Sequence, residues 1–171
     1  MKRHPALTFV PAVEDEHPFS SAGSSVSGAE ATGLSSYAQS QKTHCNCIVC
    51  GAQNPISLGL EFSVLPDGSV VSSFKGNTLF QGYTGILHGG IIAALLDATM
   101  THCLFHNGIQ AVTGDLKIRF IEPVPCSAQL KLYAKINTSF NPLYKVDSEL
   151  TCDKRLMAEG HARFMDPSGS F

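Results

Sequence analysis

The chain has 171 residues, of which 43% are hydrophobic, and a formal net charge of −2 at pH 7. A chain of this length can bury one sizeable apolar core, so we expect one folded domain. The charge balance and the absence of a basic stripe argue against the phosphate-contacting surface of nucleic-acid-binding proteins, so we expect no nucleic-acid partner.

The N-terminal part of the chain is expected to be a flexible extension over residues 1–43, ahead of a domain over residues 44–171. It opens with "MKRHPALTFVPAVEDEH", where prolines and acids interrupt the apolar stretch that a secretory signal needs. Residues 20–40 are rich in Ser and Gly and show no apolar periodicity. No run approaches the roughly 20 apolar residues that span a membrane. We therefore expect a cytoplasmic protein whose cysteines are thiols or ligands.

The run "HCNCIVCG", residues 44–51, holds three of the six cysteines beside His44. A zinc site usually draws ligand pairs from separated segments, and the sequence shows no second C-x-x-C. A redox C-x-x-C is expected at a helix start after a strand, whereas strand-like sequence follows here. We favour a turn in which Cys47 and Cys50 are small buried residues and Gly51 permits the bend, and we predict no metal.

The pattern further along the chain predicts an α+β domain. "LGLEFSVLPDGSVVSSFKG" indicates two strands around the turn "PDGS". The apolar run from His88 to His106 is too long for a strand and apolar nearly all round, which predicts a buried central helix. Four more strands are expected in "AVTGDLKIRFIEPV", "AQLKLYAKI", "YKVDSELTC" and "MAEGHARFM", the first with apolar alternation at Leu116, Ile118 and Phe120. No helices alternate with them, which favours one antiparallel sheet of about five to six strands on one helix.

Asp97 lies in the middle of the predicted helix, between "IIAALL" and "ATM". An ionised carboxylate in apolar surroundings is costly, and burial raises its pKa. Asp97 is therefore a candidate acid, base or nucleophile, although a helix aspartate can also reach solvent or cap a loop. Thr101, four residues on, lies on the same helix face, where its hydroxyl can hold a water or a substrate atom.

The tripeptide "HGG" at residues 88–90 begins the same helix. The absence of a Cβ on Gly89 and Gly90 lets a ligand approach, and the N–H groups of a first helical turn suit an oxyanion. The alternative is that the two glycines only allow close packing at the helix start and contact no ligand. Gly89 and Asp97 are separated by about 12 Å along a helix, too far to act on one carbonyl group. Two copies related by a two-fold axis can combine them, which predicts an obligate homodimer with two shared sites.

The stretch "GILHGGIIAALLDATMTH" resembles the signature of hotdog-fold acyl-CoA thioesterases, especially the phenylacetate-pathway-type subfamily. In that family His-Gly-Gly opens the central helix and an acid follows nine residues after the His, as Asp97 follows His88 here. "GDLKIRFIEPVP" and "CIVCGAQNPISLGLEF" resemble further segments of the family, so the resemblance covers roughly residues 45–166. It implies a hotdog fold and an acyl-CoA or acyl-carrier thioester substrate. It also implies a homodimer that assembles to a tetramer, and no cofactor besides the coenzyme A of the substrate.

The resemblance also implies roles for three residues. Asp97 matches the catalytic acid, which acts as a nucleophile or as a general base on water. The backbone N–H of Gly89 matches the oxyanion donor, which would come from the partner subunit. Thr101 matches a hydroxyl position that helps to place the water in relatives whose acid is Glu.

The match departs from the family in the loop before the helix. Relatives place Asn or Gln six residues before the His, where this chain has Gly82, and Gln81 lies one residue earlier. Gln81 can still reach the carbonyl group if the loop holds one extra residue. His88 is expected to shape the helix start rather than to transfer a proton. Lys117 and Arg119 share one strand face and can meet coenzyme A phosphates, although exposed strand faces often carry such charges.

Two other functions stay open. A non-catalytic hotdog module that binds acyl-CoA, for example as a regulator, is favoured by the departure at Gly82. A zinc or redox protein centred on the cysteines is the third reading. His102, Cys103 and His106 follow the catalytic turn, but no second carboxylate or cysteine lies at ligand spacing, so we predict no metal site there.

Overall fold

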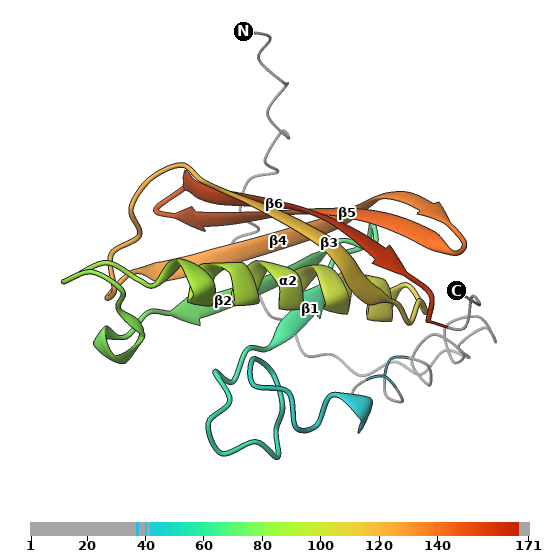
Figure 1. Ribbon diagram of the computed structural model, residues 1–171, viewed down its shortest axis with the longest axis horizontal. Coiled ribbons are helices and arrows are strands. Elements are labelled where there is room, and N and C mark those ends of the chain that lie inside the picture. The colour runs from blue at the N-terminus through green and yellow to red at the C-terminus, as the bar shows by residue number, and fades with distance from the viewer. Residues whose placement is uncertain (1–36, 38–39, 41, 168–171) are drawn as a thin grey trace, which may run out of the picture.

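The computed structural model describes Tyr37, Ser40 and residues 42–167 (Figure 1). The extension predicted over residues 1–43 therefore lies mostly outside the described residues. No helix in the described part of the chain has the length and apolar character needed to cross a membrane.

One long helix lies against one sheet (Figure 1). The sheet has six antiparallel strands in the order β1-β2-β4-β5-β6-β3, and a short 3-10 helix, η1, precedes the long helix. This arrangement confirms the α+β prediction of a hotdog fold with a central helix and five to six strands. The elements are β1 (Phe62–Val64), β2 (Val70–Lys75), η1 (Thr78–Phe80), α2 (Gly89–His106), β3 (Val112–Phe120), β4 (Gln129–Phe140), β5 (Leu143–Cys152) and β6 (Arg155–Met165).

Helix α2 forms the centre of the core because it has no continuous polar face. Every residue from Ala98 to Phe105 is buried. The sheet covers one side of the helix, and the segment 42–60 packs against it through Val49 and Leu60, which share a core with Leu95 (Figure 1). The prediction of a buried central helix is confirmed, and the N-terminal segment explains how the side away from the sheet is covered.

Strand β3 is an edge strand that pairs only with β6 in the described chain. Its apolar alternation points toward the helix, because the Phe120 ring lies 3.3 Å from the position of a Cβ built on Gly89. Val112 and Phe120 nevertheless remain 53% exposed, and Leu116 is exposed as well. Unpaired edges with apolar side chains favour association with another strand.

Ordered contacts with the domain begin before residue 44. The ring of Tyr37 stacks on that of His106 at a centroid distance of 3.7 Å. The side chain of Gln110 donates a hydrogen bond to Ser40, which is 1% exposed. The boundary at residue 44 stays a prediction, since most of the extension is outside the described residues.

Candidate active site

Asp97 lies on α2, half-buried, with its carboxylate turned toward β3. Its Oδ1 accepts a hydrogen bond from Oγ1 of Thr113 at 2.8 Å. Burial raises the pKa of Asp97, while the Thr113 bond and the charge of His44 act in the opposite direction. Asp97 thus lies between the two alternatives of the sequence analysis, neither fully buried nor fully exposed, and its hydrogen bond to a strand hydroxyl orients the carboxylate.

A cavity of about 230 Å³ opens beside this carboxylate. One wall comes from α2 and the other from the segment that contains "HCNCIVCG". Mainly apolar walls with a few polar groups are typical of small-molecule sites. The lining residues are His44, Cys47, Ile48, Val49, Ala94, Asp97, Ala98, Thr101 and His102.

A second cavity, about 280 Å³, lies at the C-terminal end of α2 around Gly68 and Asn107. Its acid, Asp67, is fully exposed and accepts hydrogen bonds from the backbone and hydroxyl of Ser69, which lower its pKa. This is ordinary chemistry for a turn. The half-buried carboxylate makes the Asp97 cavity the better candidate, although this cavity is the smaller of the two.

Thr101 lines the Asp97 cavity, as the four-residue spacing predicts. Its Oγ1 donates a hydrogen bond to the backbone carbonyl of Asp97 at 2.9 Å. The hydroxyl proton is therefore engaged within the helix, and the oxygen lone pairs are left to accept a bond from a water.

The start of α2 is shaped by His88, as expected. His88 is the N-cap, and its Nδ1 accepts a hydrogen bond from the N–H of Gly90 at 2.9 Å. Gly89 packs against the ring of Phe120, and Gly90 is exposed. Close packing at Gly89 and ligand access at Gly90 are both compatible with this geometry.

The loop before α2 holds Gln81 and Gly82 next to the helix start. A Cβ on Gly82 would lie 3.2 Å from the His88 ring, so the two are in contact. The side-chain oxygen of Gln81 accepts a hydrogen bond from the N–H of Gly85 at 3.3 Å. The structure thus brings Gln81 near His88 but uses its amide oxygen within its own turn.

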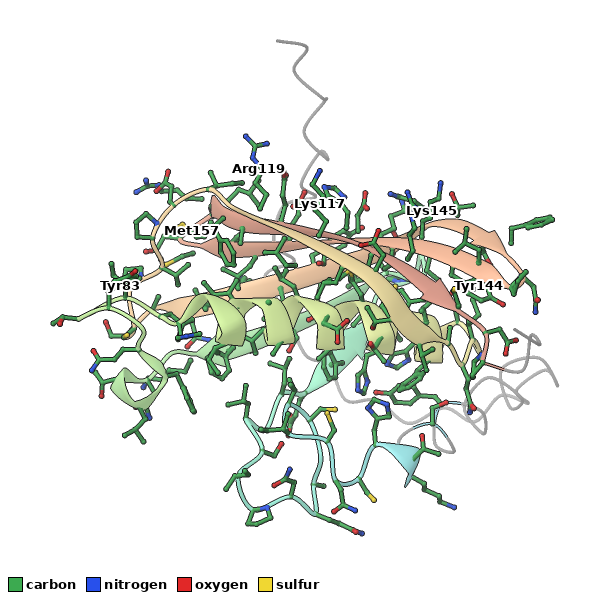
Figure 2. The ribbon with its side chains drawn as sticks, viewed as in Figure 1. Tyr83, Lys117, Arg119, Tyr144, Lys145 and Met157 are labelled. Atoms are coloured by element: carbon green, nitrogen blue, oxygen red, sulfur yellow. The ribbon has the colours of Figure 1, made fainter. Side chains whose placement is uncertain are left out.

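Lys117 and Arg119 project from the face of the sheet that points away from α2 (Figure 2). Arg119 pairs with Glu159 on the neighbouring strand at 3.2 Å. The structure therefore does not bring these two cations to the Asp97 cavity of the same chain.

Two features of the site were missed by sequence reasoning. Thr113 carries no motif signal, because only the placement of β3 against α2 brings it to Asp97. The other feature is a cluster of His44, Cys50 and His102, whose ligand atoms all lie within 4.8 Å of one another. Spacing could not reveal it, because its members come from segments 52 residues apart.

The cluster is buried enough to favour neutral side chains. Burial lowers the pKa of His44 and lowers that of His102 to about 3. Burial, aided by a hydrogen bond with Cys47, raises the pKa of Cys50 to about 12. Polar groups of this kind next to a carboxylate are uncommon in a plain apolar core.

Comparison with known proteins gives the family context. Residues 84–158 match the model of the Thioesterase superfamily. Acyl-coenzyme A thioesterase THEM4 of Bos taurus is 31% identical over 106 residues, which are 60% of this chain and 41% of that protein. The chain spans less than half the length of the curated relatives that it matches.

Solved structures share the fold. The E. coli PaaI protein from the phenylacetic acid degradation operon superposes with a TM-score of 0.66 at 16% identity, over 80% of this chain and 99% of that one. A Streptococcus mutans protein solved with acetyl CoA bound superposes with a TM-score of 0.59 at 20% identity, over 62% and 86% of the two chains. Both similarities agree with the hotdog arrangement of helix and sheet.

Proposed function

We propose that this chain, a hotdog fold whose residues 84–158 match the Thioesterase superfamily, hydrolyses acyl-CoA thioesters to a free acid and coenzyme A. The observation that carries the proposal is the half-buried carboxylate of Asp97, which lies within the matched segment and faces a cavity. The activity named for the curated relative and the acetyl CoA of the Streptococcus mutans structure support the substrate class. The position of Asp97 after "HGG" supports the phenylacetate-pathway-type subfamily.

Asp97 supplies the attack on the thioester carbonyl carbon in one of two ways. As a general base it takes a proton from water, whose oxygen bonds to the carbon. As a nucleophile it bonds to the carbon itself, and water then hydrolyses the mixed anhydride. In both routes the carbon–sulfur bond breaks, the sulfur of coenzyme A takes up a proton, and the acyl group leaves as the acid. Thr113 orients the carboxylate, and Thr101 offers an acceptor for the water.

The oxyanion of the tetrahedral intermediate is stabilised by the backbone N–H of Gly89 from the partner subunit. The distance of about 12 Å along one helix between Gly89 and Asp97 favours this arrangement. The exposed apolar edge of β3 supports a homodimer joined through that strand. Dimers then assemble further to a tetramer.

The remaining substrate contacts come from the start of α2 and from strand β3. Gly90 and Gly82 border the acyl-CoA entry at the start of α2, where the lack of a Cβ leaves room. Lys117 and Arg119 would contact coenzyme A phosphates of a substrate that reaches the outer sheet face. No cofactor besides the coenzyme A of the substrate is required.

A non-catalytic acyl-CoA-binding module is the second candidate. It is favoured by the loop before α2, where Gly82 replaces the amide side chain of relatives and Gln81 bonds to Gly85. Such a module would bind the thioester at the same cavity and leave it intact.

The proposal is tested by an assay that detects released coenzyme A with a thiol reagent. The substrates are acyl-CoA esters of increasing chain length and acyl-carrier protein thioesters. Calorimetry with the same compounds measures binding in parallel. We expect turnover with at least one acyl-CoA. Binding without turnover of any thioester would select the non-catalytic module, and the absence of both would refute the two candidates together.

A further inference from the structure

A cluster of histidine and cysteine side chains beside Asp97 has no part in the proposed reaction. It joins His44 and Cys50 of the N-terminal segment to His102 of α2, and the Sγ of Cys50 lies 3.2 Å from Nε2 of His102. We infer that this cluster is a binding site for one divalent metal ion of the zinc class. Cys47, which lines the Asp97 cavity but is not within 4.8 Å of all three ligand atoms, would move in as the fourth ligand. The bound ion would link the N-terminal segment that contains His44 and Cys50 to helix α2.

The separations fit a tetrahedral site. Zinc bonds of about 2.3 Å to sulfur and about 2.0 Å to nitrogen place neighbouring ligand atoms roughly 3.3–3.8 Å apart. The three ligand atoms of the cluster lie within 4.8 Å of one another, so closure needs movements of at most about 1 Å. Thiolate and imidazole together select zinc or cobalt over magnesium or calcium.

The loop from Cys47 to Gly51 is tight, and both Cys47 and Cys50 pack against the core. The N–H of Gly51 donates to the carbonyl of Cys47 at 2.8 Å, and a Cβ on Gly51 would lie 2.4 Å from the backbone nitrogen of Cys47. Only glycine fits such a tight loop. The N–H of Val49 donates to the Sγ of Cys47 at 3.4 Å, and Cys47 contributes to the raised pKa of the Cys50 thiol. A backbone N–H aimed at sulfur is a contact that stabilises a ligating thiolate.

The two histidines are arranged as ligands usually are. His102 is 3% exposed, and its Nδ1 lies 3.2 Å from the hydroxyl of Tyr37, which leaves Nε2 for the metal side. A hydrogen bond to the second ring nitrogen commonly orients a ligating histidine. Nδ1 of His44 is buried and has no hydrogen-bond partner among the described residues, whereas buried polar atoms nearly always have one. A bound ion would satisfy the His44 ring.

A redox-active pair of Cys47 and Cys50 explains less of the arrangement of these side chains than a metal site does. A disulfide between Cys47 and Cys50 would not explain why the buried His102 and the half-buried His44 converge on the sulfur of Cys50. The four candidate ligands of "HCNCIVCG" lie in one short stretch of sequence, which is unusual for a structural zinc site. In the fold, α2 supplies His102 from a separate segment, as such sites usually require.

Metal analysis of the purified full-length chain tests the inference. After gel filtration, elemental analysis should find about one zinc per chain, and exchange with cobalt should give the visible absorption of a tetrahedral thiolate site. Cys50→Ser and His102→Asn should each retain less than about a tenth of the metal. Cys152→Ser on β5 and His106→Asn on α2, which lie outside the cluster, should retain all of it.

A titration of the wild-type chain with zinc against a competing chelator gives a readout that needs no variant. A chain that is folded by circular dichroism, lacks zinc as purified and fails to compete with the chelator would overturn the inference. Unchanged metal content in folded Cys50→Ser would show that the metal binds elsewhere. Unchanged affinity and cobalt spectrum in Cys47→Ser would overturn the assignment of the fourth ligand.

Discussion

Two polar centres lie next to each other on α2, and they are assembled in different ways. The carboxylate centre takes Asp97, Thr101 and the glycines of "HGG" from one continuous stretch of sequence. The His/Cys cluster joins Cys50 to His102 across 52 residues. Members of both centres line the same cavity: Asp97 and Thr101 of the first, His44 and His102 of the second. The comparison shows that a site built within one helix can be recognised by spacing, whereas a site built between segments becomes visible only in the fold.

The change with the largest expected effect separates the two centres chemically. Asp97→Asn keeps the shape of the side chain but removes the base or nucleophile. We expect kcat/KM for the best acyl-CoA to fall roughly 10²–10⁴-fold, with unchanged metal content. The coenzyme A release assay and elemental analysis measure the two quantities. A retained rate in a folded Asp97→Asn dimer would show that Asp97 is not the catalytic group.

The fold was predictable because its elements differ in periodicity. The apolar run after His88 could only be a long buried helix, and the turn "PDGS" separated two strands, as β1 and β2 show. Asp97 stood out because a carboxylate interrupts that run. These predictions used local patterns, which a single sequence displays in full.

The missed residues depend on contacts between elements. Thr113 reaches Asp97 because β3 pairs with β6 at the sheet edge, and no local pattern encodes this placement. "HCNCIVCG" was interpreted correctly as a turn with its bend at Gly51, but Cys47 and Cys50 are only partly buried rather than buried. Its histidine and cysteines were also judged without the partner that α2 provides. Strand order and the packing of the N-terminal segment are properties of the whole chain, so single-sequence reasoning could not supply them.

The second prediction concerns a variant at the proposed dimer interface, which should affect the carboxylate centre and leave the His/Cys cluster unchanged. Leu116→Glu places a charge on the exposed apolar side of the β3 edge, where we propose that the two subunits join. We expect a monomer by light scattering and a loss of kcat/KM of roughly 10²-fold, because the oxyanion donor comes from the partner. Metal content should not change.

Phe140→Glu is the matched control for this variant. Phe140 is also an exposed apolar residue, 75% exposed at the turn between β4 and β5, and it lies outside β3. It should leave the dimer and the rate intact. A Leu116→Glu chain that remains dimeric and active would contradict the β3 interface.

The third prediction disrupts only the His/Cys cluster. When the free concentration of an ion is about 100 times its Kd, binding stabilises the fold by about 2.7 kcal/mol. This free energy corresponds to a Tm change of roughly 5–11 °C. Chelation, or Cys50→Ser, should therefore lower Tm by this amount, while kcat/KM falls less than about tenfold because Asp97 stays in place. Scanning calorimetry with Cys152→Ser as control measures the change. An identical Tm with and without chelator would remove the stabilising role of the cluster.

The smallest expected effect concerns the hydrogen bond from Thr113 on β3 to the carboxylate of Asp97. Asp97 must be ionised to act, so the rate rises with pH through its pKa. The Thr113 hydrogen bond lowers that pKa against the effect of burial, and His44 is the titratable group on the opposite side that acts in the same direction. Thr113→Val should move the acid limb of kcat/KM to higher pH and lower the plateau by at most roughly tenfold. Thr113→Ser should restore both.

Identical pH profiles for Thr113→Val and the wild-type chain would show that Thr113 does not position Asp97. The same variant also tests whether the two centres are independent. Thr113 contacts the carboxylate from β3, whereas the cluster approaches the cavity from the N-terminal segment. A shifted pH profile with unchanged metal affinity would mean that the carboxylate centre can be altered without disturbing the ligands. A change in both the pH profile and the metal affinity would mean that Asp97 and the cluster share one hydrogen-bonded network across α2.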